Sequence, residues 1–154
     1  MKPRVYIETT VISYLTAKPT LNALQEGRRQ LTSEWWARRG MDFTTTISPL
    51  VYAEASRGDI TAAAARLEAL KDLLMLPLDE RARLLARVLI APGAIPAKAT
   101  DDAAHIAICA VHSIPYLLTW NFKHIANAEI RLKLDYLCSI NGYKLPTICT
   151  PEEL

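Results

Sequence analysis

The sequence has few of the residues that define several common classes of protein. It contains three cysteines, an odd number with no C-x-x-C pair, which argues against both a disulfide framework and a thiolate zinc site. Its five glycines form no dinucleotide-binding, P-loop or nucleophile-elbow motif, so these three chemistries have no support. Lys and Arg number 18 against 16 Asp and Glu, an excess too small to identify a nucleic-acid-binding protein by charge alone.

Long apolar runs are also missing. The longest stretch without Lys, Arg, Asp or Glu, residues 103–122, contains two histidines, a proline and an asparagine, so it fits a buried helix and strand better than a membrane span. Glu8 interrupts the first apolar run, and we therefore expect no signal peptide and a cytoplasmic protein. The length of 154 residues and the 51% hydrophobic content fit a single globular domain, residues 1–154.

Strands and helices are expected to alternate along the chain. Short β-branched or aromatic runs predict strands, and amphipathic runs bounded by capping residues, proline or glycine predict helices. The expected strands are residues 4–8, 43–47, 73–78, 116–119 and 145–149. The expected helices are residues 21–39, 50–57, 61–71, 79–90 and 100–112, with Ser48, Asp79 and Thr100 as caps, and a last helix beginning at Thr150. This order predicts an α/β fold, a three-layer α/β/α sandwich with a central mostly parallel sheet.

Several acids are expected at one edge of this sheet. In a parallel sheet the carboxyl ends of the strands and the amino ends of the helices share the edge where ligands bind. Glu8 ends the first strand, Asp101 and Asp102 begin a helix, and Asn121 follows a strand. Glu54 lies about 9 Å along its helix, but a long side chain that leans toward the amino end can reach the same pocket.

Carboxylates gathered at one edge repel one another unless protons or a cation offset their charge. Oxygen ligands of this kind suit Mg²⁺ or Mn²⁺. Such an ion can polarise a phosphoryl oxygen and lower the pKa of an attacking water. The residues therefore indicate metal-dependent hydrolysis of a phosphodiester.

The sequence around these residues resembles a known family, the PIN-domain ribonucleases, and within it the VapC-type toxins of toxin–antitoxin pairs. The resemblance covers nearly the whole chain, and the order and spacing of its motifs are together fairly specific. The motifs are residues 6–10 (YIETT) opening into 11–15 (VISYL), 51–55 (VYAEA), 102–107 (DAAHIA) and 118–122 (LTWNF).

The resemblance implies one PIN-like α/β/α domain that uses Mg²⁺ or Mn²⁺ to cleave single-stranded regions of RNA. Carried over by position, it implies Glu8, Glu54 and Asp102 as metal ligands and adds Asn121 as the fourth catalytic position. Thr119 or Thr9 would support the site. It also implies a cognate antitoxin protein as a partner and a homodimer.

Two positions depart from the pattern of the family. Glu8 stands where aspartate is more typical, which keeps the charge on a side chain one methylene longer. Asn121 stands where an acid is often found, and its amide oxygen adds no charge. Asp101 could replace part of that charge or only stabilise the start of its helix, so the number of metal ions stays open.

The same residues also have structural interpretations. Asp101 is favoured as a residue that stabilises the helix dipole, Glu54 could pair with Arg57, and Asn121 could form a turn. A zinc stripe of Asp102, His105, Cys109 and His112 would span about three turns, too far for one ion, so His105 is expected to be packed or hydrogen-bonded.

Three functions stay open at this point. The first is a ribonuclease toxin, the second is a degenerate PIN-like module that binds RNA or protein without cutting, and the third is a phosphatase of small esters. Arg57, Lys98 and Lys123 could hold phosphates near the site. The three arginines of residues 79–90 are expected to form only a solvated helix face, and they are Arg81, Arg83 and Arg87.

Overall fold

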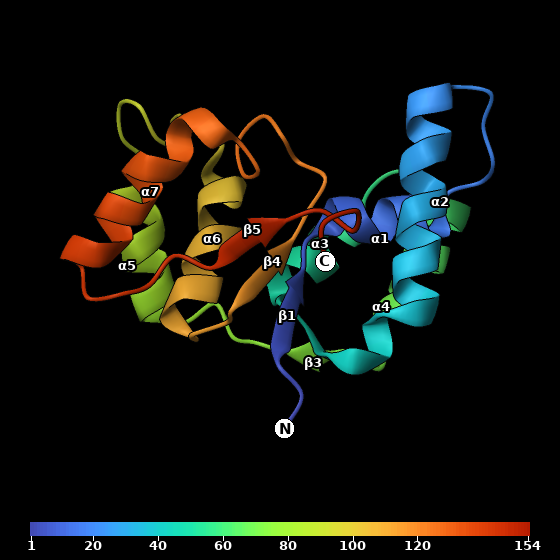
Figure 1. The fold of residues 1–154 in the computed structure, drawn as a ribbon, viewed down its shortest axis with the longest axis horizontal. Helices are drawn as coiled ribbons and strands as arrows, with labels where there is room; N and C mark the ends of the chain where they lie inside the picture. The colour runs from blue at the N-terminus through green and yellow to red at the C-terminus, as the bar shows by residue number, and fades with distance from the viewer.

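Five short strands form one sheet in which every neighbouring pair is parallel. The structure is a computed structural model that describes residues 1–154. The strands are β1 (Arg4–Ile7), β2 (Thr44–Ile47), β3 (Leu74–Met75), β4 (Tyr116–Leu118) and β5 (Thr147–Cys149), in the order β3-β2-β1-β4-β5 (Figure 1). The chain steps outward from β1 to β3 and then returns to the other side of β1. The strand order therefore reverses between β1 and β4, where their carboxyl ends form a crevice of the kind that binds ligands in open α/β sheets.

Seven α-helices cover the two faces of the sheet. The helices on one side are α1 (Thr9–Thr16), α2 (Ala23–Arg38), α3 (Pro49–Ala55) and α4 (Ile60–Leu70), and a 3₁₀ turn at Gly40–Asp42 leads into β2. The helices on the other side are α5 (Glu80–Leu89), α6 (Thr100–Val111) and α7 (Ala128–Ile140) (Figure 1). The expected three-layer α/β/α sandwich is thus confirmed, with a sheet that is parallel throughout. None of the helices combines the length and the apolar character needed to cross a membrane.

The central strand β1 is buried on both faces. Val5, Tyr6 and Ile7 have no exposed surface, as expected for a parallel strand covered by helices on both sides. Two helices begin at a capping aspartate. The Asp59 carboxylate accepts a hydrogen bond from a backbone N–H in the first turn of α4, and the Asp79 carboxylate does so in α5.

Two helices were not expected from the sequence. The β-branched residues of α1 favour a strand locally, and the helix forms because Glu8 caps it and its buried face packs into the core. Helix α7 begins at the cap Asn127 and turns Leu134, Leu137 and Cys138 toward the core. No element was expected for this segment, in which the buried apolar residues are separated by exposed residues.

Three local expectations were wrong. The strand expected at residues 73–78 is reduced to two residues at the edge of the sheet, where only one neighbouring strand supports it. The helix expected at Thr150 is a single turn, although the Glu153 carboxylate accepts the Thr150 N–H as a capping residue would. Ser48 and Thr100 do not cap through their side chains, because the Ser48 hydroxyl is bonded to Tyr6 and α6 already begins at Thr100.

The packing of α7 can be tested with two leucines of that helix. Leu134 is fully buried and Leu132 is 82% exposed. We expect Leu134→Ala to lower the free energy of unfolding by about 2–5 kcal/mol, because it leaves a cavity in the core. Leu132→Ala should change it by less than about 0.5 kcal/mol. Urea unfolding followed by circular dichroism measures both, and equal midpoints for the two variants would contradict the placement of α7.

Candidate active site

Glu8 leaves β1 at its carboxyl end and caps α1. Its side chain is only 3% exposed, and three donors bind the carboxylate. Oε1 accepts hydrogen bonds from the hydroxyls of Thr10 at 2.5 Å and Thr119 at 2.6 Å, and Oε2 accepts the Thr10 backbone N–H at 3.0 Å. A buried carboxylate needs such donors, because an uncompensated charge in the interior is strongly unfavourable.

Glu54, from α3, lies beside Glu8 and is bonded to a buried histidine. Glu54 Oε1 accepts the Thr9 hydroxyl at 2.6 Å and lies 2.7 Å from His105 Nε2. The other ring nitrogen, His105 Nδ1, lies 2.7 Å from the hydroxyl of Tyr6, which in turn bonds Ser48 Oγ at 2.8 Å. His105 is therefore hydrogen-bonded at both nitrogens, as the sequence analysis expected of it.

The Glu54–His105 contact shifts the pKa of both partners. Burial alone would raise the pKa of the Glu54 carboxyl, but the hydrogen bond and charge of His105 hold that pKa below its usual value. Burial alone would lower the pKa of His105, but the bond to Glu54 and the charges of Glu8, Glu54 and Asp102 raise that pKa above its usual value. Because an ionised carboxylate only accepts hydrogen bonds, His105 Nε2 carries a proton in this contact.

Asp102, in the first turn of α6, is held by two residues that follow β4. Its Oδ1 accepts the Asn121 side-chain amide at 3.1 Å, and its Oδ2 lies 3.0 Å from His124 Nδ1. Asn121 Oδ1 accepts the backbone N–H of His124 at 3.0 Å, which fixes the turn that carries both residues. Asn121 therefore forms the expected turn and also orients Asp102.

A threonine connects the two groups of residues. The Thr119 hydroxyl donates to Glu8 and accepts the backbone N–H of Asn121 at 2.9 Å, so the position of Asn121 depends on that of Glu8. The ligand atoms of Glu8, Glu54 and His105 all lie within 4.8 Å of one another. Asp102 lies one turn before His105 on α6, outside this closest group, and contributes to the same electrostatic environment.

The carboxylates have acceptor positions to spare and no Lys or Arg partner. Glu54 pairs with His105 and Asp102 with His124, and Glu8 forms no ion pair. No hydrogen bond reaches Glu54 Oε2, and Glu8 Oε2 and each oxygen of Asp102 accept only one. A carboxylate can accept about four hydrogen bonds. The donor set thus fits a hard divalent cation, which prefers oxygen ligands.

The basic residues singled out in the sequence lie at different distances from this site. Lys98 lines a pocket of about 280 Å³ together with Asp101, Asp102 and His124. The positive charge of Arg57 helps to lower the pKa of Glu54, although the two residues form no ion pair. Lys123 is exposed on the turn after β4. The expected solvated face of α5 is confirmed, because its three arginines are all exposed.

Two residues of the site were missed from the sequence. Thr10 both donates to Glu8 and accepts the backbone N–H of Trp120 at 2.9 Å, but nothing in the sequence distinguishes its role from that of the neighbouring Thr9. His124 was not expected in the site, because it belongs neither to the end of a strand nor to the start of a helix. The available signal was its position three residues after Asn121, where an Asx turn returns the chain toward the same edge.

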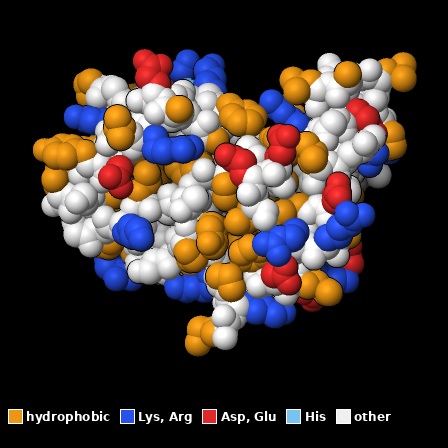
Figure 2. Space-filling model, viewed as in Figure 1, with side chains coloured by type: hydrophobic (Ala, Val, Ile, Leu, Met, Phe, Trp, Pro, Cys, Tyr) orange, Lys and Arg blue, Asp and Glu red, His pale blue; other side chains and the backbone are white.

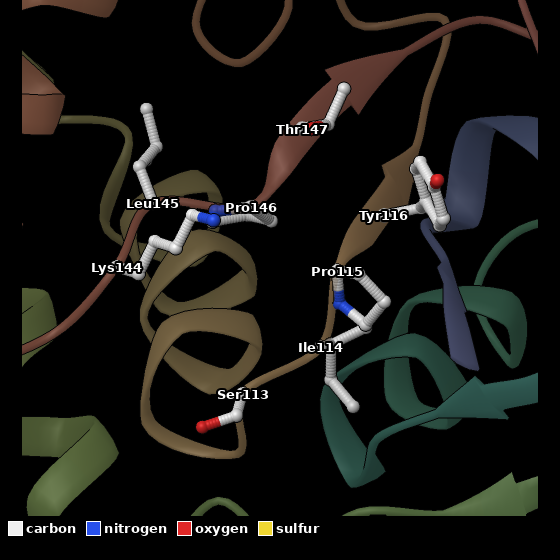
Figure 3. A pocket seen from close by; sticks show the side chains of 8 residues that line it. All are labelled: Ser113, Ile114, Pro115, Tyr116, Lys144, Leu145, Pro146 and Thr147. Carbon is white, nitrogen blue, oxygen red and sulfur yellow. The ribbon is translucent and has the colours of Figure 1, made fainter. Parts of the chain in front are cut away.

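Another pocket, of about 410 Å³, lies away from these carboxylates (Figure 3). It is found at the amino ends of β4 and β5, the opposite edge of the sheet. Its lining residues are Ser113, Ile114, Pro115, Tyr116, Lys144, Leu145, Pro146 and Thr147. None of the residues of the carboxylate site contributes to it, so its size says nothing about the chemistry of that site.

Comparison with known proteins gives a likeness of fold. Two chains of solved structures match, and one belongs to the crystal structure of VapBC2 from Rickettsia felis bound to a DNA fragment from their promoter. That match has a TM-score of 0.56 and 14% sequence identity, and it covers 95% of this chain and 97% of the other. No protein-family model matches the sequence, and no curated protein does. The resemblance to PIN-domain proteins is thus confirmed at the level of the fold.

The threonine between Glu8 and Asn121 allows a direct test of the site's structure. Thr119→Val keeps the shape of the side chain but removes a donor to a buried carboxylate and an acceptor for Asn121. We expect the free energy of unfolding to fall by about 1–3 kcal/mol. The matched control is Thr147→Val, because Thr147 is exposed and its hydroxyl makes no hydrogen bond, and it should cost less than about 0.5 kcal/mol. Equal urea midpoints for the two variants would be evidence against the Glu8 hydrogen bonds described here.

Proposed function

We propose that this protein is a Mg²⁺- or Mn²⁺-dependent endoribonuclease that acts as the toxin of a toxin–antitoxin pair. The observation that carries the proposal is a set of three acids, Glu8, Glu54 and Asp102, that have no Lys or Arg partner near the edge where β1 and β4 end. The ligand atoms of Glu8 and Glu54 lie within 4.8 Å of each other and of His105, and Asp102 lies one turn before His105 on α6. The likeness of fold to a VapBC structure supports it. A fold alone does not determine activity, so the residues at this edge carry the argument.

Glu8, Glu54 and Asp102 are the residues that would hold the metal. When bound, a divalent ion supplies a Lewis acid for the phosphodiester and lowers the pKa of an attacking water. The donor set leaves the choice between Mg²⁺ and Mn²⁺ open, because both ions prefer oxygen ligands and both ring nitrogens of His105 are already hydrogen-bonded.

The protein's own residues pre-organise this edge. The hydroxyls of Thr10 and Thr119 hold the Glu8 carboxylate, and Asn121 and His124 hold that of Asp102. Side chains fixed in this way lose little conformational freedom when a substrate binds. This small loss of entropy is a main reason why positioned groups accelerate a reaction. Lys98, on the pocket beside Asp102, would attract the RNA backbone.

One observation favours the second candidate, a PIN-like module that binds RNA or protein without cutting it. Each carboxylate already has hydrogen-bond donors, and His105 and His124 offer protons where a catalytic site would place a cation. Metal-dependent cleavage separates the two candidates, since the non-catalytic module would bind without turnover.

We also propose the partners that a toxin requires. A cognate antitoxin protein would cover the carboxylate edge, and a basic side chain of that partner would be attracted to its unpaired negative charge. A homodimer and a cytoplasmic location stay predictions. The Rickettsia felis structure contains VapBC2 together with promoter DNA, which supports the antitoxin as a class of partner.

Metal binding is expected to stabilise the folded protein. Because the carboxylates converge only in the native state, Mn²⁺ at about 100 times its Kd should add ~2.7 kcal/mol to the free energy of unfolding and raise Tm. The increase should vanish in Asp102→Asn and Glu8→Gln and persist in Glu68→Gln, whose exposed side chain pairs only with Lys71. Differential scanning calorimetry measures the shift. An unchanged Tm for the wild type in millimolar Mn²⁺ would remove the metal from the proposal.

Cleavage of RNA is the direct test of the activity. With Mn²⁺ or Mg²⁺ the protein should leave 5′-phosphate and 3′-hydroxyl ends, because water rather than the neighbouring 2′-hydroxyl is the nucleophile. Asp102→Asn should lower turnover at least ~100-fold. Lys98→Ala should mainly lower the affinity for RNA and the dependence of that affinity on salt. The control is Arg83→Ala, on the solvated face of α5. Products ending in a 2′,3′-cyclic phosphate, or full activity in EDTA, would exclude the mechanism, and preference for a chromogenic monoester would favour a phosphatase.

A further inference from the structure

Two aromatic side chains flank Asn121 and form a surface next to the carboxylates. Trp120 is buried, whereas Phe122 is 45% exposed, and their rings meet edge to face with centroids 6.2 Å apart. Trp120 is fixed on two sides. Its indole N–H donates to Thr32 Oγ1 in α2 at 2.8 Å, and its backbone N–H donates to Thr10 Oγ1. Phe122 therefore projects from a rigid support whose position relative to Glu8 is fixed through Thr10.

An arginine of α2 completes this surface. The Arg28 guanidinium lies 5.5 Å from the centroid of the Trp120 ring and 5.1 Å from that of Phe122. Its polar side-chain contact is a 3.4 Å hydrogen bond to the Tyr14 hydroxyl, and it forms no ion pair with any acid. A planar cation on an aromatic face, with its charge not neutralised by a carboxylate, is well suited to nucleic acid.

These residues line a pocket of about 310 Å³, which we call the α2 aromatic pocket. Its wall is formed by Ala23, Leu24, Gly27, Arg28, Leu31, Trp120, Phe122 and Glu152. In the space-filling view the outline is hollowed at the carboxyl edge of the sheet, between α2 on one side and the helices α6 and α7 on the other (Figure 2). The pocket is thus part of the edge that carries the proposed active site.

Gly27 leaves the α2 wall of this pocket without a side chain. It lies in the interior of α2, where glycine costs about 1 kcal/mol relative to alanine. A Cβ added there would meet no atom within 4 Å, so packing inside the protein does not require glycine. The absence of a side chain leaves the wall of the pocket open to a flat group.

We propose that the α2 aromatic pocket binds one unpaired base of a single-stranded RNA, stacked on Phe122, while Arg28 contacts the adjoining phosphate. This inference rests on the proposed function and names where its substrate is held. Proteins recognise single-stranded RNA by stacking its exposed bases on aromatic rings and on arginine guanidinium groups. Bases that are paired in a duplex are not available for such stacking. Glu152 repels phosphate but accepts hydrogen bonds from a base amino group, so the base rather than the phosphate enters the pocket.

The second exposed aromatic with a cation on it provides a matched control. Lys133 Nζ lies 5.6 Å from the ring centroid of Tyr136, which is 56% exposed on α7. This pair is also a cation on an exposed aromatic ring, but it belongs to another helix and does not line the α2 aromatic pocket. Tyr136→Ala therefore removes an equivalent ring without changing the proposed binding place.

The experiment measures the affinity for a short fluorescein-labelled single-stranded RNA of mixed sequence by anisotropy, in EDTA and in Ca²⁺. Phe122→Ala should weaken binding roughly 5- to 100-fold, the effect expected for the loss of one stacked base. Gly27→Leu should weaken it while Tm is unchanged or higher, because leucine fills the pocket and favours the helix. Arg28→Ala should also flatten the dependence of affinity on salt.

Several outcomes would overturn the inference. These are wild-type affinity for Phe122→Ala and Gly27→Leu, an equal loss for Tyr136→Ala, and no binding of the RNA by the wild-type protein in either buffer. If the pocket variants keep wild-type RNA affinity but a co-expressed antitoxin no longer neutralises their toxicity, the pocket is a protein-binding surface instead. If RNA binding depends on Phe122 but no metal supports cleavage, the proposed ribonuclease is wrong and this inference holds. If RNA is cleaved equally well with and without the Phe122 ring, the proposed ribonuclease holds and this inference is wrong.

Discussion

The buried carboxylate of Glu8 is the constraint on which the rest of the site depends. A charge that is almost fully buried is tolerated only when hydrogen bonds replace the lost water, and here the donors come from α1 and from the residue after β4. Both hydroxyls also accept a backbone N–H, from Trp120 to Thr10 and from Asn121 to Thr119. One charge thus fixes the start of α1 and the path of the chain beyond β4.

The proposed ribonuclease and the non-catalytic alternative differ in what neutralises this edge. His105 is fully buried beneath the carboxylates, and their charges raise its pKa, so a proton on its ring stabilises Glu54 without any metal. His124 Nδ1 lies 3.0 Å from Asp102 Oδ2, so Glu54 and Asp102 each have a histidine beside them in place of Lys or Arg. Both proposed functions start from this arrangement, and they differ in whether a metal ion is added to it.

Much of the site could be predicted from the sequence because it follows from topology. Once the strands are parallel, Glu8, Asp102 and Asn121 must share the carboxyl edge, whatever the details of packing. The contacts of His124 could not be predicted in this way, since they depend on how a turn after β4 folds back onto α6. Helix α1 was not expected from the sequence, because its β-branched start favours a strand locally and only tertiary packing and the Glu8 cap make it helical.

The three residues Trp120, Asn121 and Phe122 bring chemistry and recognition onto one short segment. The first is anchored to α2 and α1, the second orients Asp102, and the third projects beside Arg28. A shift of this segment would therefore move the carboxylate and the aromatic surface together, and it would alter turnover and binding at once. Gly27 and Arg28 belong to α2 and do not touch the carboxylates, so recognition can vary there while the geometry of the acids is kept. In the proposed nuclease, this division would let substitutions at Gly27 and Arg28 change the RNA that is bound while the carboxylates keep their positions.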